Sequence, residues 1–131
     1  MIAPWTNEYV GIPYRLHGRD RAGCDCWGLI RLVLEKEFGV LVPSFSGEYV
    51  QDAGDYARII DANISLVDAV EVIEPAAGDL ILCRICGMPC HVGIYAGNGY
   101  MLHTLTAHDS ALALITSSRW ACRIEGFYRV R

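Results

Sequence analysis

The alternation of hydrophobic and polar residues is most regular over residues 26–38, where it predicts an α-helix. Asp25 is a favourable N-cap for this helix, and Gly39 suits the position that follows its last turn. The apolar stripe is wide, which predicts a central and mostly buried helix. Its apolar residues are Leu29, Ile30, Leu32, Val33, Leu34 and Phe38.

The second half of the chain predicts strands. The turn-forming stretch Pro75–Asp79 leads into an apolar run at Leu80–Ile85. Residues His91–Ala96 and Tyr100–Thr106 predict a hairpin about Gly97-Asn98-Gly99, and residues 122–130 alternate like a final strand.

The remaining segments are less regular. Residues 5–18 predict a short helix or turn that enters a loop, and further helices are expected from about 52 to 62 and from about 65 to 71. Helices that precede strands along the chain favour an α+β fold with an antiparallel sheet.

Length and composition narrow the class of protein. A chain of 131 residues predicts a single domain, 1–131, and 53 % hydrophobic residues predict a packed core. The net charge of −4 argues against a nucleic-acid partner. The N-terminal residues lack the pattern of a signal peptide and no apolar run is long enough to span a bilayer. We therefore expect a protein made in the cytoplasm that does not insert into membranes.

Candidate chemistry begins at the predicted helix start, in the sequence Gly23-Cys24-Asp25-Cys26. A helix N-terminus and a nearby imidazolium both favour the thiolate form of a cysteine. With Asp25 as N-cap, Cys26 is the first helical residue, whereas Cys24 lies outside the helix. Cys26 is therefore the predicted nucleophile, and the alternative is a small core residue of a buried helix.

Two downstream histidines, His91 and His103, complete a nucleophilic set only if they share one face of the hairpin. A two-residue loop at Asn98-Gly99 would put them on opposite faces, because side chains alternate along a strand. A three-residue loop pairs Ala96 with Tyr100 and makes the histidines diagonal neighbours, about 7–8 Å apart at the backbone. The prediction is the three-residue loop.

The roles follow from this arrangement. His91 takes the proton of Cys26, which is expected within a few ångströms, and later returns it to the leaving amine. His103 hydrogen-bonds the other ring nitrogen of His91 and fixes its tautomer. The order Cys before His is that of papain-like enzymes. His17 and His108 are assigned no role.

At this point the chain resembles the NlpC/P60 family of papain-like cysteine peptidases, which cleave peptides of bacterial cell walls. The resemblance implies a nucleophile helix packed on a C-terminal antiparallel sheet, with Cys26, His91 and His103 as nucleophile, base and third member and no cofactor. It also implies that Tyr14 supports the oxyanion or the substrate and that Asp25 faces the substrate's amino end. The matching segments are Gly11–Tyr14, Asp25–Leu29, Pro75–Leu80 and His91–His103.

The implied reaction is hydrolysis of an amide in the stem peptide of peptidoglycan, with the bond between γ-D-glutamate and the diamino acid as the expected target. Trp27 stands where the family usually has a small Ser, so it is either a specificity residue or a core residue. A bulky residue here and a short chain resemble the subgroup carried by tailed phages and gene-transfer agents. That resemblance implies a virion-associated hydrolase that acts on the periplasmic wall, with other tail-tip proteins as partners.

Two alternatives remain open at this stage. The spacing of Cys83, Cys86 and Cys90, with Cys24, Cys26 or Cys122 as a further ligand, is compatible with a structural zinc or iron–sulfur site. The fold could also serve as a structural tail-tip subunit with little activity.

Overall fold

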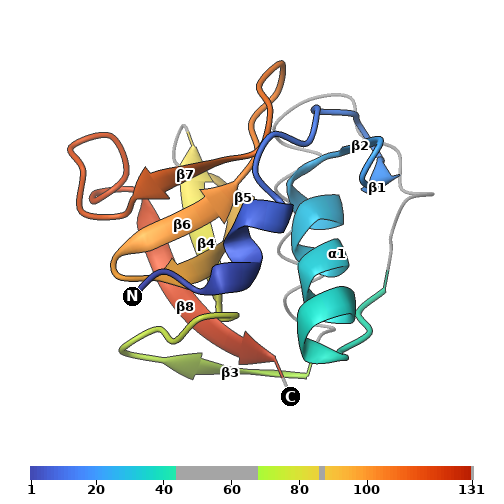
Figure 1. Ribbon diagram of the computed structural model, residues 1–131. Coiled ribbons are helices and arrows are strands. Elements are labelled where there is room, and N and C mark those ends of the chain that lie inside the picture. The colour runs from blue at the N-terminus through green and yellow to red at the C-terminus, as the bar shows by residue number, and fades with distance from the viewer. Residues whose placement is uncertain (44–67, 86–87, 131) are drawn as a thin grey trace.

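The computed structural model describes residues 1–43, 68–85 and 88–130, in which one α-helix packs against a twisted antiparallel sheet and a short 3-10 helix lies near the N-terminus (Figure 1). In the described part of the chain the strand order is β3-β8-β4-β5-β6-β7, and every neighbouring pair is antiparallel. This confirms the α+β class. The elements are η1 (Pro4–Glu8), β1 (Arg19–Asp20), β2 (Gly23–Cys24), α1 (Cys26–Phe38), β3 (Ala69–Val72), β4 (Leu80–Ile85), β5 (Met88–Gly97), β6 (Tyr100–His103), β7 (Ala111–Leu114) and β8 (Ile124–Val130).

Helix α1 has the predicted bounds and caps. The side chain of Asp25 accepts a hydrogen bond from the Gly28 N–H, and Gly39 ends the helix in the left-handed conformation at φ 66°. Gly28 has a second function, because a Cβ there would lie 2.0 Å from the Gly18 carbonyl oxygen. Only glycine allows the loop before α1 to pack this closely on the first turn.

The two faces of the sheet bury different clusters. On one face, α1 packs against Leu80, Leu82, Val92, Ile94 and Leu102, and Cys26 belongs to this first cluster. The other face carries a second cluster made of Ile81, Cys83, Met101 and Trp120. The strand residues divide between the clusters by odd and even positions, as expected from the alternation of side chains along a strand.

The β5–β6 hairpin has the predicted register but not the predicted tip. Tyr95 pairs with Met101, as the three-residue loop requires, yet Tyr100 pairs with Gly97 rather than with Ala96. The turn itself has two residues, Asn98 and Gly99, both at positive φ. A β-bulge at Ala96 supplies the extra residue and restores the register in the body of the hairpin. The predicted loop is therefore wrong and the predicted pairing beyond it is confirmed.

Some other predicted elements differ from the structure, in part because they depend on strands far apart in the chain. The helix expected over about 65–71 is wrong in its described part, because β3 pairs there with β8. Strand β7 was not predicted, and the strand expected to reach Thr106 ends at His103. The helix expected over about 52–62 lies outside the described residues. Strand β4 and most of the C-terminal strand match their predictions.

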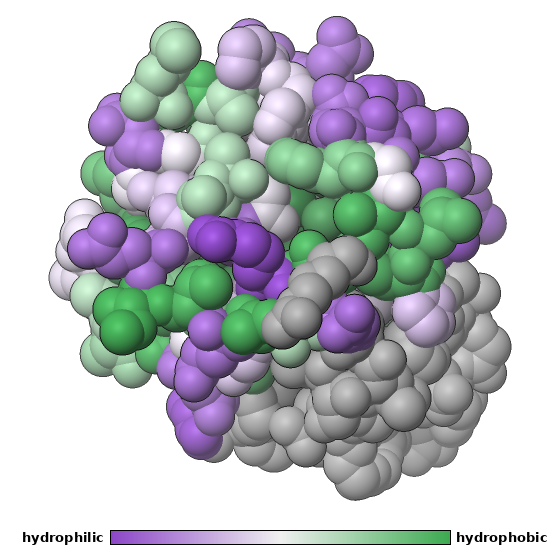
Figure 2. Space-filling model, turned by 90° about the horizontal axis from the view of Figure 1, so that it is seen from below, coloured by the Kyte–Doolittle hydropathy of each residue, from purple (hydrophilic) through white to green (hydrophobic). Residues whose placement is uncertain are grey.

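The end of the molecule that carries β3 and the last turn of α1 mixes apolar and polar side chains on its surface (Figures 1 and 2). Phe38 and Leu41 at the end of α1 and Val70 and Ile73 around β3 are exposed large hydrophobic residues. Across the described ranges, no helix is both long enough and apolar enough to span a bilayer.

Candidate active site

His91 on β5 and His103 on β6 form a directly hydrogen-bonded pair. The distance from His91 Nε2 to His103 Nδ1 is 3.0 Å, and the ring centroids lie 5.2 Å apart. The two histidines are 3 % and 7 % exposed. The prediction that they share one face and hydrogen-bond is confirmed. Because His91 uses Nε2 in this bond, its Nδ1 is the ring nitrogen left for another partner.

Burial sets the charge state of the pair. Burial and the neighbouring His103 ring lower the pKa of His91 to about 3. Burial, with the cation of Arg119 as a further cause, lowers the pKa of His103 to about 4. Desolvation penalises the protonated form of imidazole, so both rings are neutral at pH 7.

Trp120 lies against both histidines and was not singled out by the sequence. Its ring stacks on His91 at a centroid distance of 5.5 Å and meets the edge of His103 at 4.9 Å. Trp120 comes from the turn between β7 and β8, and nothing in the local pattern of that polar turn links it to the hairpin. The one feature of the sequence that could have drawn attention to Trp120 is that it is a large aromatic residue among polar neighbours.

Cys26 and Cys24 differ in position and burial, as their predicted places inside and outside the helix imply. Cys26 is the first residue of α1 and is 4 % exposed, while Cys24 on β2 is fully buried. Burial and the nearby Asp25 carboxylate raise the pKa of the Cys24 thiol to about 12. Cys24 therefore stays a neutral thiol at physiological pH, which favours Cys26 as the reactive cysteine.

A segment around Tyr14 connects the start of α1 to the connection that follows His103. The Cys24 N–H donates to the Pro13 carbonyl at 3.0 Å, while the Ser110 N–H donates to the Ile12 carbonyl at 2.8 Å. The Tyr14 hydroxyl bonds Thr106 and lies in the field of Asp25 and Cys26. Burial raises the pKa of Tyr14, so its hydroxyl stays protonated and can donate a hydrogen bond. The segment brings the cysteine turn and the end of β6 to a common side chain.

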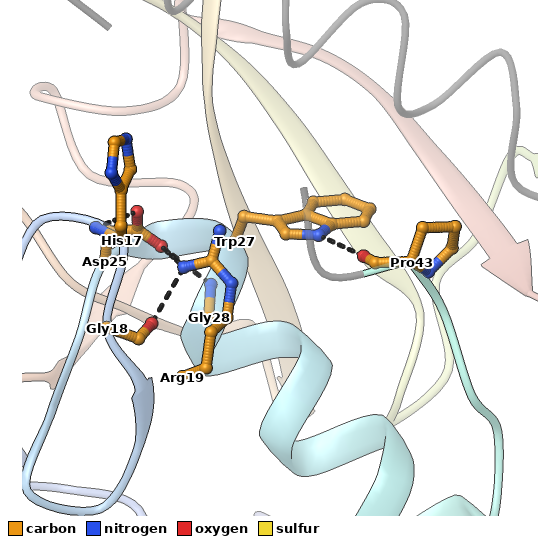
Figure 3. Close-up of polar contacts among 7 residues, drawn as sticks. All are labelled: His17, Gly18, Arg19, Asp25, Trp27, Gly28 and Pro43. Atoms are coloured by element: carbon orange, nitrogen blue, oxygen red, sulfur yellow. Dashed lines mark hydrogen bonds and ion pairs between the residues drawn. The ribbon is translucent and has the colours of Figure 1, made fainter. Parts of the chain in front are cut away.

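Asp25 is buried and engaged by several donors, as Figure 3 shows. Its Oδ1 accepts from the Gly28 N–H and from Arg19 Nη1, both at 2.8 Å, and its Oδ2 accepts from the His17 N–H at 2.9 Å. The side chains of Arg19 and Asp25 are 16 % and 2 % exposed. Asp25 thus caps α1 and ties the preceding loop to it.

Trp27 points into the core rather than into a site. It is 2 % exposed, it belongs to the first cluster, and its indole N–H donates to the Pro43 carbonyl at 2.8 Å (Figure 3). Of the two interpretations of Trp27, this geometry favours core packing over a specificity role.

Two of the three cysteines of the alternative metal site, Cys83, Cys86 and Cys90, have side chains outside the described part of the structure. Cys83 is buried, with its Sγ 3.9 Å from the sulfur of Met101. Cys86 and the Cys90 side chain lie outside what the structure describes. Among the residues that it does describe, no group of three or more metal-ligating side chains comes together.

Replacing Asp25 should destabilise the fold. Asp25→Ala leaves the guanidinium of Arg19 without its buried partner and removes the helix cap, so the free energy of unfolding should fall by about 3 kcal/mol. Urea unfolding measures the loss. Asp20→Ala is the matched control, since the exposed Asp20 also accepts one local N–H bond, from Ala22; it should cost less than about 1 kcal/mol. Equal losses in the two variants would contradict the assignment.

Acid should destabilise the protein through the histidine pair. An unfolded histidine titrates near 6.5, whereas the folded pair titrates at about 3 and about 4, so the unfolded chain binds protons first as the pH falls. The stability from the neutral pair is complete above pH 6.5 and is lost as the pH falls toward 4. His103→Gln should flatten the dependence of unfolding free energy on pH by up to about 1.4 kcal/mol per pH unit. His108→Gln, which removes an exposed histidine ring, is the matched control.

Comparison with known proteins shows which proteins the chain is similar to. The chain is 27 % identical over 123 residues to the murein DD-endopeptidase MepS/murein LD-carboxypeptidase of Escherichia coli K12, covering 94 % of this chain and 58 % of that protein. It is 24 % identical to the gamma-DL-glutamyl hydrolase of Bacillus subtilis 168, covering 95 % and 27 %. The chain thus spans little more than half, or less, of these relatives.

A solved structure and a family model extend the comparison. A protein of Staphylococcus aureus Mu50 described as similar to lipoprotein, NLP/P60 family, superposes with a TM-score of 0.65 at 27 % identity, covering 95 % of this chain and 38 % of that one. The model of the NlpC/P60 family matches residues 11–129. A match over nearly the whole chain, together with the shared fold, establishes that the chain belongs to the NlpC/P60 family.

Proposed function

We propose that the protein is a cysteine peptidase that hydrolyses an amide bond in the stem peptide of peptidoglycan. The observation that carries the proposal is the hydrogen bond between His91 and His103. It holds the neutral His91 ring through Nε2 and leaves Nδ1 outside that bond. A cysteine at a helix N-terminus is the matching nucleophile.

The reaction divides into two steps. The Cys26 Sγ attacks the scissile carbonyl carbon while His91 Nδ1 accepts the thiol proton, and the C–N bond then breaks as that proton passes to the leaving amine. Water next attacks the thioester, gives one proton to His91, and releases the acid and the restored thiol. For His91 to accept at Nδ1 it must carry its own proton on Nε2 and donate it to His103 Nδ1. The third member thus sets the tautomer.

Tyr14 is the proposed donor to the developing oxyanion. Its hydroxyl is kept protonated by burial and senses the charge of Cys26, and its partner Thr106 belongs to the connection after His103. A donor that is already in place costs no reorganisation when negative charge develops on the carbonyl oxygen. Asp25 acts as cap of the helix and anchor of the preceding loop, because its carboxylate is occupied by protein donors.

The relatives support a peptidoglycan or γ-glutamyl peptide as the substrate class. The names of the two relatives refer to DD-endopeptidase, LD-carboxypeptidase and gamma-DL-glutamyl hydrolase activities. Our proposed target is the bond from γ-D-glutamate to the diamino acid, as the family resemblance implies. Association with a phage tail or gene-transfer agent stays a prediction of the sequence resemblance, and neither relative's name refers to such a particle.

Limited alkylation should identify Cys26 as the most reactive buried thiol. Cys122 is exposed and would react through simple access, so the experiment uses Cys122→Ser protein. Iodoacetamide at substoichiometric amounts, followed by peptide mapping, should label Cys26 ahead of Cys24, since burial holds the pKa of the Cys24 thiol at about 12. First labelling at Cys24 or Cys86 would rule out the assignment of the nucleophile.

Digestion of purified sacculi tests the activity directly. Wild-type protein should release stem-peptide fragments identifiable by mass spectrometry, and Cys26→Ala should lower the rate at least about 1,000-fold, because the members of such a set act as a unit. His91→Ala should be nearly as severe and His103→Ala milder, since His103 only orients the base. The matched control Cys122→Ser should retain full activity. If wild type and Cys26→Ala release equal amounts of peptide, the protein is not this enzyme and a structural tail-subunit role takes precedence.

A further inference from the structure

We propose that Trp120 is a positioning residue of the reaction, whose indole holds the two imidazole rings in the orientation that lets His91 receive the thiol proton. The inference deepens the proposed function and rests on it, because ring orientation matters to catalysis only if His91 is the base. Trp120 itself has no role in bond making.

The three rings contact one another in pairs. Trp120 lies nearly parallel to His91, at an interplanar angle of 29°, and nearly perpendicular to His103, at 85°. The imidazoles themselves meet at 74°. All three centroid distances, 5.5, 4.9 and 5.2 Å, fall in the range of favourable aromatic contacts. Each ring plane is thus set by two neighbours.

The hydrogen bond between the histidines does not by itself fix these planes. One N···N contact limits the separation of two atoms, but the terminal torsion of a histidine side chain has a broad energy profile. Rotation of His91 about that torsion would move Nδ1 while the bond at Nε2 could survive with small adjustments. A flat indole stacked on the ring opposes this rotation, which is what a base needs if it is to meet a thiol at hydrogen-bond distance.

The indole is itself firmly placed. The turn that carries it is tied by hydrogen bonds from the Trp120 N–H to the Ser117 carbonyl at 3.1 Å and from the Arg84 N–H on β4 to the Arg123 carbonyl at 2.6 Å. Trp120 is 3 % exposed within the second cluster, and the guanidinium groups of Arg119 and Arg123 lie 5.7 and 5.9 Å from its ring. The indole is thus packed within the second cluster and has two cations near its ring.

Contact with the indole also contributes to the burial of the histidine pair. Arg119 acts on His103, Arg123 lies near the indole, and Cys83 on β4 is the cross-strand partner of His91. The proposed mechanism adds Cys26 as the thiol that meets His91. Burial is the largest cause of the lowered pKa of both histidines. Removal of the indole should therefore admit water and raise both pKa values toward 6.5, which gives a readout that is independent of catalysis.

The test compares a ringless and an aromatic replacement of Trp120 with a matched control. Trp120→Leu should lower kcat on a soluble stem peptide about 10- to 100-fold with little change in KM, the loss expected from a misaligned reacting group. Trp120→Phe keeps a ring against His91 and should stay within a few-fold of wild type. Trp5→Leu removes an indole that packs on Tyr9 and Phe38 against the first cluster, and it should leave kcat unchanged.

Side-chain NMR of the imidazole nitrogens supplies the second readout in the same variants. Trp120→Leu should raise the pKa of both histidines, and Trp5→Leu should not. Trp120→Met serves as the ringless variant should the leucine variant not fold. Wild-type kcat together with unchanged histidine signals in the ringless variant would overturn the proposal. If wild-type protein cleaves no stem peptide, the proposed function fails, and unchanged imidazole signals would then still refute a ring-holding role for Trp120.

Discussion

The single extra residue at Ala96 is the constraint on which the histidine pair depends. The turn pairs Gly97 with Tyr100, and if that register continued down the hairpin, His103 would point to the face opposite His91. The bulge shifts the register by one and brings both side chains to the same face. It is anchored outside the hairpin, since the Ala3 N–H donates to the Ala96 carbonyl at 2.7 Å. The N-terminal segment therefore helps to set the geometry of the histidine pair through the bulge.

At the start of α1, the negative charge of Asp25 is balanced by the positive charge of Arg19. A buried carboxylate beside the nucleophile opposes ionisation of nearby thiols, as the effect of Asp25 on Cys24 shows. The guanidinium of Arg19 acts on the same thiol in the opposite direction. With Asp25 paired and hydrogen-bonded, the first turn keeps its cap while the field of the helix N-terminus still favours a thiolate at Cys26. Gly28 makes this possible by letting the loop that carries Arg19 approach the turn.

Features that depend on residues close together in the chain could be predicted from the sequence, and contacts between distant segments could not. Helix α1 and its caps depend on neighbours within the helix, so periodicity and Asp25 were sufficient. The shared face of the histidines was predicted correctly through the wrong loop, because a three-residue loop and a two-residue turn with a bulge give the same register. Strand β3 pairs with a strand at the far end of the chain, and Trp120 reaches the histidines from a separate turn. No local pattern encodes either contact, nor the pairing of Arg19 with Asp25.

The burial of the histidine pair determines the proton transfers that it can perform. Burial lowers the pKa of His91, so this neutral imidazole does not hold the thiol proton in the resting site without compensation. In the proposed mechanism that compensation is the negative charge on sulfur and then on the carbonyl oxygen, so proton transfer is coupled to attack on the substrate. The same low pKa makes the imidazolium a strong acid once it forms. An amide nitrogen leaves only when it is protonated, and the buried pair is thereby better suited to expelling the amine than to storing a thiolate.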